Sequence, residues 1–142
     1  MDRESPEEVV QVGYVRMYHD TDGESHFENL TLELEERDFA PPAAPAHVAV
    51  FLEPSGTLFF GVHPGWAGET PHPSPQRQLF SILRGTVELT VSDGERRRFG
   101  PGDLILIDDT EGKGHSSHVV GRDELIIFGA VLADQQAHPG PS

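Results

Sequence analysis

Turn-forming residues divide the chain into short segments, and this division restricts the possible folds more than any other feature. The sequence contains 15 glycines and 12 prolines. Several of them belong to clear turn signals: Pro54-Ser55-Gly56, Ser92-Asp93-Gly94 and Gly100-Pro101-Gly102-Asp103. No segment between such signals has the periodicity of an amphipathic helix of about ten or more residues. We therefore expect an all-β protein, a sandwich or barrel of many short strands.

Runs of apolar and β-branched residues between the turns are the expected strands. In residues 24–34 apolar and polar residues alternate, which is typical of a strand with one buried face. Residues 104–107 are all apolar, so both faces of that strand should be covered. A proline-rich connector at residues 38–46 and a glycine- and proline-rich loop at residues 64–75 should remain outside the sheets. The expected strands are residues 24–34, 47–52, 57–62, 78–83, 87–91, 97–99, 104–107, 115–120 and 124–132.

The length of 142 residues corresponds to one domain. We expect a single domain over residues 1–142, with a core of about residues 10–132 and flexible tails at residues 1–9 and 134–142. The N-terminal segment MDRESPEEVV lacks the basic-then-apolar order of a signal peptide. No apolar run approaches the roughly 20 residues of a membrane helix. These features predict a cytoplasmic location.

The charge and the cysteine content exclude several classes of partner and chemistry. The formal net charge of −14 repels phosphate backbones and anionic lipids, so we expect neither a nucleic-acid nor a membrane partner. The chain has no cysteine, which excludes disulfides, thiol nucleophiles and thiolate metal sites. The expected partner is therefore a small molecule.

Two stretches of the sequence carry a recognisable order of residues. Residues 72–85, HPSPQRQLFSILRG, contain a histidine, an apolar strand and a closing Arg-Gly. Later, Pro101-Gly102-Asp103 forms a turn, and His115 follows a polar loop. This order resembles the cupin superfamily, whose first motif has His-x-His, a glutamate and a glycine, and whose second motif has Pro-Gly-Asp and a later histidine. The resemblance is clear from about residue 72 to 132 and looser upstream.

Aligned with these motifs, the chain carries a degenerate metal-binding set. Gly85 matches the glycine of the first motif, and Gln78 then stands where the family has glutamate. The two histidine positions fall on His72 and Ser74, and His115 matches the second motif. The resemblance implies a small single-domain cupin: a double-stranded β-helix, or jelly-roll barrel, with a small-molecule pocket and a homodimeric assembly. Cupins include oxygenases, isomerases, cyclases and non-enzymatic binders, so the fold does not name the reaction.

A metal site in this chain would use His72, Gln78 and His115, with His63 as a possible fourth ligand. Imidazoles bind zinc, iron, manganese and nickel. An amide oxygen is a weaker ligand than a carboxylate and brings no negative charge to balance a dication. The cofactor is therefore either one divalent metal ion (Zn, Fe, Mn or Ni) or none, with His72 and His115 then acting as hydrogen-bonding groups of the pocket.

The alternation of side chains along a strand predicts which residues line that pocket. If Gln78 faces the cavity, Phe80 on the same strand should face it too, together with His72 and Ser74. His115 and His118 lie on opposite faces of their strand, and the family register places His115 inside. We expect Gln78 and Phe80 to bind substrate, and His72 and His115 to be catalytic.

His26 and Glu28 form a second candidate catalytic pair. They lie on one face of an expected strand, and an imidazole beside a buried carboxylate is a candidate acid–base pair. The alternative is that this end of the strand is near the surface and the pair is solvated or structural.

Three residues in loops are further candidates for substrate binding: His63, Trp66 and Lys113. Trp66 could stack on a planar ligand near the barrel mouth or plug the edge of the sheet. Lys113, the only lysine, lies between two glycines close to His115 and could bind a carboxylate, or it could be an exposed loop charge.

Together these observations predict a small-molecule enzyme with its pocket in a cupin barrel. The expected chemistry is acid–base catalysis, such as isomerisation, cyclisation or elimination of a biosynthetic intermediate, without a required metal. Two alternatives stay open. One is a metal-dependent cupin oxygenase or isomerase, and the other is a barrel that binds or senses a small molecule without catalysis.

Overall fold

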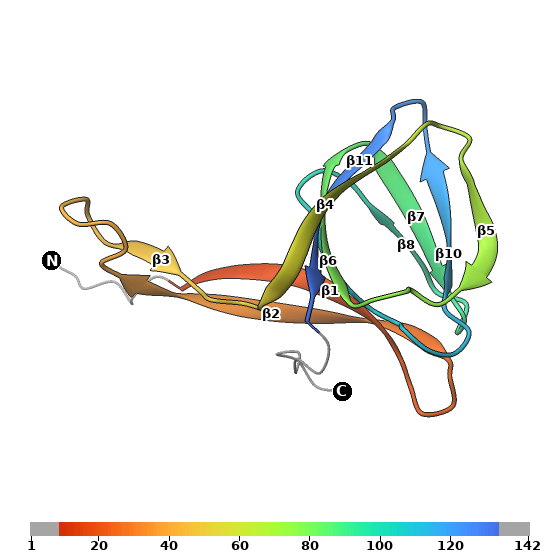
Figure 1. The fold of residues 1–142 in the computed structure, drawn as a ribbon, viewed down its shortest axis with the longest axis horizontal. Coiled ribbons are helices and arrows are strands. Elements are labelled where there is room, and N and C mark those ends of the chain that lie inside the picture. The colour runs from red at the N-terminus through yellow and green to blue at the C-terminus, as the bar shows by residue number, and fades with distance from the viewer. Residues whose placement is uncertain (1–8, 134–142) are drawn as a thin grey trace, which may run out of the picture.

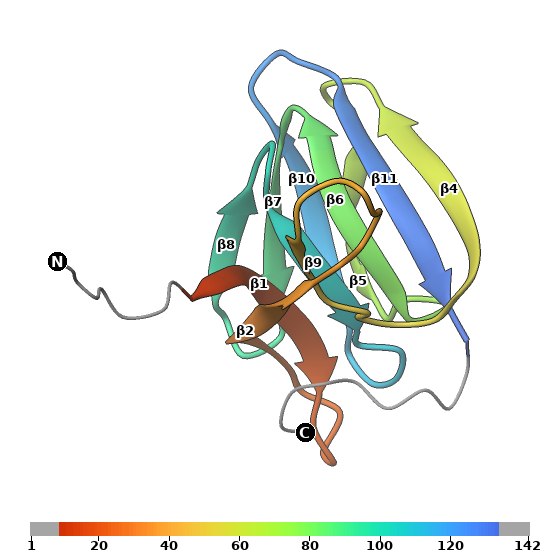
Figure 2. The same cartoon turned by 90° about the vertical axis from the view of Figure 1, so that its left-hand side faces the viewer.

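Two β-sheets face each other and enclose the interior of the molecule (Figures 1 and 2). This computed structural model describes residues 9–133. One sheet has seven strands, in the order β3 (Ala46–Val48), β2 (Ser25–Arg37), β1 (Val10–His19), β9 (Leu104–Asp108), β6 (Gln78–Arg84), β11 (Leu125–Leu132) and β4 (Pro54–Val62). The other has four, in the order β5 (Ala67–His72), β10 (His115–Val120), β7 (Thr86–Val91) and β8 (Arg96–Phe99).

The described residues contain no helix, and all pairs of neighbouring strands are antiparallel except β1 and β9. β7 and β8 form the hairpin predicted at Ser92-Asp93-Gly94, and Gly94 has a φ of +100°, as the turn requires. The predicted all-β jelly-roll barrel is confirmed.

Two strands lie where none was expected. β1 is absent from the set of predicted strands, although Val10, Val12 and Tyr14 alternate with residues of the opposite face. β5 lies in the stretch expected to be a loop. It contains Gly68 and Pro71, which both disfavour strands, and it forms because its backbone pairs with β10. Long-range pairing therefore outweighs local propensity in β5.

Two local predictions near residue 50 are wrong. Pro54-Ser55-Gly56, predicted as a turn, is the first part of β4. β4 is the last strand of its sheet and pairs only with β11, and a proline is tolerated at the start of such an edge strand. The strand expected at residues 47–52 is reduced to β3, which pairs with the far end of β2.

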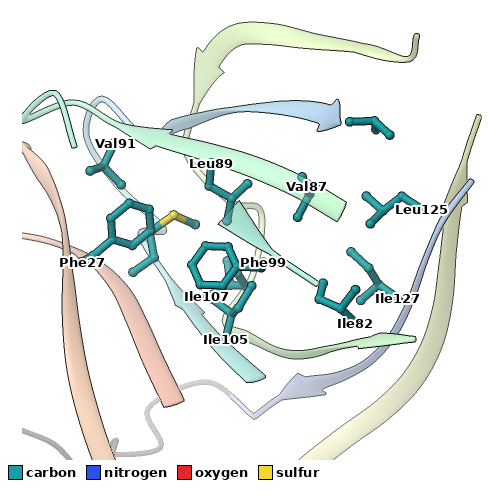
Figure 3. Close-up of a cluster of buried hydrophobic side chains, with 12 residues drawn as sticks. Phe27, Ile82, Val87, Leu89, Val91, Phe99, Ile105, Ile107, Leu125 and Ile127 are labelled. Carbon is teal, nitrogen blue, oxygen red and sulfur yellow. The ribbon is translucent and has the colours of Figure 1, made fainter. Parts of the chain in front are cut away.

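Apolar side chains from both sheets pack in the interior, from Phe27 and Val91 on one side to Ile82 and Leu125 on the other (Figure 3). The ring centroid of Phe27 is 6.0 Å from that of Phe99. On the outside of the seven-stranded sheet, Leu106 is fully buried in a second apolar cluster that β2 helps to cover. Both faces of residues 104–107 are thus covered, as predicted from their composition.

The ends of β1 and β2, together with β3, project away from the barrel as a ribbon (Figure 1). Phe39 and Val50, in the segments before and after β3, are 69% and 96% exposed. The homodimer implied by the family resemblance stays a prediction. The tails predicted at residues 1–9 and 134–142 lie outside the described residues, apart from Val9, which directly precedes β1. Within residues 9–133, no helix is long and apolar enough to cross a membrane.

Candidate active site in the barrel cavity

A cavity of about 330 Å³ lies between the two sheets, and several side chains of the apolar core form part of its walls. Its walls are mostly apolar and come from both sheets, for example Phe60 of β4, Phe80 of β6, Leu89 of β7 and Ile127 of β11. Polar side chains are few: His72, Ser74, Gln78, His115 and Ser117. A concave, largely apolar cavity with a small set of converging polar groups is the usual form of a small-molecule site.

Alternation along β6 places its side chains as the sequence predicts. Gln78, Phe80 and Ile82 face the cavity, whereas Leu79 packs in the apolar cluster on the outer face of the sheet. Arg77, just before the strand, bonds to Asp108 on that outer face. The structure therefore brings Gln78 and Phe80 into one cavity with His72, Trp66 and His115.

β10 shows the same alternation with histidines. His115 and Ser117 line the cavity, and His118 is exposed on the other face. His115 is placed beside His72 because β10 pairs with β5 at these two residues. Gly114 makes this approach possible: it has a φ of +71°, and a side chain there would collide with the backbone of His72.

Asp109 lies directly after β9 and bonds to two of the polar residues that line the cavity. Its side chain is fully buried and accepts hydrogen bonds from the Ser74 hydroxyl at 2.8 Å and from His115 Nδ1 at 2.6 Å. Its backbone oxygen also accepts a bond from the Ser74 amide at 2.9 Å. Two loops that are distant in sequence are thereby fixed to each other and to His115.

The bond to Asp109 assigns the hydrogen of the His115 ring. A carboxylate only accepts hydrogen bonds, so Nδ1 carries the hydrogen and Nε2, on the other side of the ring, is an acceptor at the cavity wall. A buried carboxylate on Nδ1 also stabilises the imidazolium that forms when Nε2 takes a proton. The arrangement is that of an oriented general base.

Sequence reasoning missed Asp109. Adjacent residues of an extended chain face opposite sides, and Asp108 and Asp109 do so, but no pattern in the sequence indicated the partner of either one. The signal that could have found Asp109 is its position at the start of the short polar loop that ends at His115.

The residues present do not fit a divalent metal ion. The four positions of the metal-binding motif hold two imidazoles, an amide and a hydroxyl, and the Ser74 hydroxyl is already donated to Asp109. The rings of His72 and His115 have centroids 5.6 Å apart, and His72 Nδ1 donates to the Pro73 carbonyl. Within the described part of the chain, no three His, Cys, Asp or Glu side chains are grouped to hold a metal. Only two of the four positions thus carry a strong ligand, whereas catalytic zinc sites use three, such as three histidines or two histidines and a glutamate.

His26 and Glu28 lie away from the cavity and do not pair with each other. Glu28 accepts a bond from Arg16 at 2.7 Å. His26 lies between Asp20 at 2.7 Å and Asp93 at 2.8 Å, one on each ring nitrogen. The bonds to Asp20 and then Asp93 raise the pKa of His26, which makes this residue an ionic link between the β1–β2 turn and the β7–β8 turn.

His63 and Lys113, two of the three loop residues predicted to bind substrate, also lie outside the cavity. His63 is 86% exposed and lies 3.4 Å from Glu124. Lys113 Nζ bonds to Glu24 at 2.6 Å, and its backbone amide bonds to Gly23. The bond to Glu24 raises the pKa of Lys113. Lys113 thus ties the loop before His115 to the β1–β2 turn.

Comparison with known proteins places the barrel in a family. The profile of the cupin domain family matches residues 58–130, just over half of the chain. Among solved structures, the chain is similar to the cupin domain of Cnp3 from Schizosaccharomyces pombe, with 13% sequence identity over 90% of this chain and 86% of that one and a TM-score of 0.41. No curated protein sequence matches the chain.

Proposed function

Because the chain belongs to the cupin family and its barrel encloses a cavity, we propose that it is a small-molecule enzyme that performs acid–base chemistry there. His115 is the base, and it takes a proton from the bound molecule through Nε2. The reaction class is isomerisation, cyclisation or elimination, each of which begins with the transfer of a proton.

The hydrogen bond between Asp109 and His115 is the observation that carries this proposal. At 2.6 Å, and with Asp109 fully buried, the bond holds the ring in one tautomer and one orientation. Ser74 in turn holds Asp109. A positioned base of this kind typically contributes about 10²–10⁴-fold to a rate. Asp109 and Ser74 are positioning residues, because they act through His115.

The walls of the cavity support the same chemistry. Apolar side chains such as Phe60, Phe80 and Ile127 exclude water, and the attraction between an imidazolium and a carboxylate is stronger in such surroundings than in water. The proton that arrives on His115 therefore meets a partner charge that is already in place. No step of this chemistry passes through a metal, since the motif positions supply only two strong metal ligands, His72 and His115.

An elimination reaction with a visible product tests the base directly. In 5-nitrobenzisoxazole, removal of the proton on C3 forms a nitrile while the N–O bond breaks, and the oxygen leaves as a coloured phenolate. We expect the protein to accelerate this reaction and His115→Gln to lower kcat/KM by about 100-fold or more.

His118→Gln is the matched control, because His118 lies three residues further on the same strand and is exposed on the opposite face. Equal rates for the two variants would remove His115 as the base and favour a barrel that only binds its ligand. A rate that is lost on chelation and restored by zinc, iron, manganese or nickel would favour the metal-dependent alternative.

A further inference from the structure

We infer that the molecule bound in the cavity is uncharged, has a hydrocarbon body about the size of two fused six-membered rings, and carries one oxygen function at one end. This inference rests on the proposed function only in taking the barrel cavity as the substrate site. It follows from the volume of the cavity, the chemistry of its walls and the distribution of its polar groups.

The volume sets the size of the ligand. The cavity measures about 330 Å³. An engineered apolar cavity of about 150 Å³ is known to hold benzene, so this cavity corresponds to about two such rings. A single ring would leave about half of the apolar wall without contacts, and a third ring would exceed this volume and extend through the open side of the cavity into solvent.

The walls set the charge of the ligand. Among the lining residues in the described part of the chain, none is Asp, Glu, Lys or Arg. A carboxylate or phosphate would therefore enter without a cation to pair with, in a protein of net charge −14. A cation would find no free carboxylate, because the oxygens of Asp109 are bonded to Ser74 and His115.

The polar groups set the orientation of the ligand. His72, at the end of β5, Gln78, at the start of β6, and His115, at the start of β10, lie at one end of the cavity. Ile82 and Leu125, on the far parts of β6 and β11, line the other end and are buried. Gln78 can donate to a carbonyl and His115 Nε2 can accept from a hydroxyl. The oxygen of the ligand therefore lies at the histidine end, beside the base.

Trp66 provides a direct measure of occupancy. It is the single tryptophan of the chain, and it lines the cavity. Its ring packs edge-on against Phe60, with centroids 6.0 Å apart, and lies over Gly68, where a side chain would collide with it. A ligand in the cavity should change the fluorescence of this one residue.

The test is a fluorescence titration of Trp66 with three saturated probes, with free tryptophan titrated in parallel to correct for the weak absorption of the two ketones where tryptophan is excited. 2-Decalone has two fused rings and one carbonyl, decalin-2-carboxylate has the same skeleton with a negative charge, and cyclohexanone has one ring. We expect 2-decalone to bind about 100-fold more tightly than cyclohexanone, from the burial of four more carbon groups, and at least about tenfold more tightly than the carboxylate. Equal affinity for the ketone and the carboxylate, or for one ring and two, would overturn the inference.

A pair of variants locates the binding. Ser117→Leu fills the cavity and should abolish the response to 2-decalone, whereas Ser116→Leu, on the other face of β10, should retain it. Circular dichroism checks that both variants are folded, and an unchanged affinity in folded Ser117→Leu would place the ligand elsewhere.

His115→Gln separates this inference from the proposed function. The variant should still bind 2-decalone within about threefold of the wild type, because this ketone has no hydroxyl to donate to His115 Nε2 and its rings contact the apolar walls. If it binds 2-decalone but eliminates as fast as the wild type, the ligand class stands and the base is wrong. If elimination needs His115 but the probes are not ranked as expected, the base stands and the ligand class is wrong.

Discussion

Asp108 and Asp109 are adjacent in sequence, yet they face opposite sides of the seven-stranded sheet and have opposite kinds of partner. Both are nearly inaccessible, at 8% and 0% exposed. On the outer face, Asp108 is bonded by Arg16 at 3.0 Å and Arg77 at 2.9 Å. On the inner face, Asp109 is bonded by a hydroxyl and an imidazole.

The difference shows how a buried carboxylate that stabilises the fold can be distinguished from one that would support the proposed proton transfer to His115. The charge of Asp108 is already balanced by two guanidinium groups that stay charged at every relevant pH. The side chain of Asp109 is bonded instead by a hydroxyl and an imidazole, and a proton gained by His115 would place a positive charge beside this carboxylate. A carboxylate whose charge is always neutralised by arginine stabilises the fold. A carboxylate that gains a positive partner only when a histidine is protonated would assist the proposed proton transfer.

The largest expected effect comes from removing the carboxylate that Arg16 and Arg77 share on the outer face of the sheet. Asp108→Asn removes the charge opposite two arginines, one of which is only 5% exposed, and should lower the free energy of unfolding by about 3 kcal/mol. Urea unfolding measures this loss. Glu124→Gln is the control, because its pairs with His63 and Arg84 are exposed, and it should change stability by at most about 0.5 kcal/mol. A similar loss of unfolding free energy for both variants would show that the pairs of Asp108 with the two arginines do not stabilise the fold.

Substitution of Asp109, the carboxylate on the inner face, should have a smaller effect, and this effect should be on the reaction rate. Asp109→Asn keeps the shape of the side chain but weakens its hold on His115, so kcat/KM for 5-nitrobenzisoxazole should fall by about 10–100-fold. Nitrogen NMR of the imidazole should show that Nδ1 carries the hydrogen in the wild type and that this preference is reduced in the variant. An unchanged rate with a lost tautomer preference would show that orientation of the ring does not limit the reaction.

The smallest expected effect comes from His26, which lies between Asp20 and Asp93 and away from the cavity. The pKa of His26 is raised by Asp20 and then Asp93, and the pKa of Asp20 is lowered, chiefly by its bond to His26. The link therefore stabilises the fold fully above the ordinary pKa of aspartate, 3.8, and below that of histidine, 6.5, and it is lost as pH rises through the raised pKa of His26.

His26→Gln should accordingly cost about 0.5–1 kcal/mol near pH 5 and almost nothing near pH 9, as measured by urea unfolding at both values. The elimination rate should not change, because His26 lies outside the cavity. A cost that is the same at both pH values would show that the contribution of His26 is packing and not charge.

Local periodicity was sufficient for much of this structure. The alternation of β6 correctly separated Gln78 and Phe80, which line the cavity, from Leu79 on the outer face. The same rule separated His115 from His118. The glycine of the Asp-Gly turn gave the β7–β8 hairpin. These features depend on the geometry of single strands and turns, which the order of residues specifies directly.

The remaining features depend on contacts between distant segments. β5 forms only because β10 pairs with it, and its own residues give no strand signal. Asp109 meets Ser74 across 35 positions of the sequence. His26 has two aspartates as partners, and Glu28 has an arginine, which the spacing of His26 and Glu28 could not show. The catalytic roles of His72 and His115, and the binding roles of Trp66, Gln78 and Phe80, stay predictions.

The adjacency of Asp108 and Asp109 makes the length of β9 critical. A single inserted or deleted residue within this strand would reverse the direction of the side chains between that point and the end of the strand. The aspartate that faces the arginines would then enter the cavity, and the one that holds His115 would be turned away. The ion pairs of Asp108 and the hydrogen bond that holds His115 would be lost together, even though both aspartates were still present. The number of residues in β9 is therefore as important to this barrel as the two aspartates at its end.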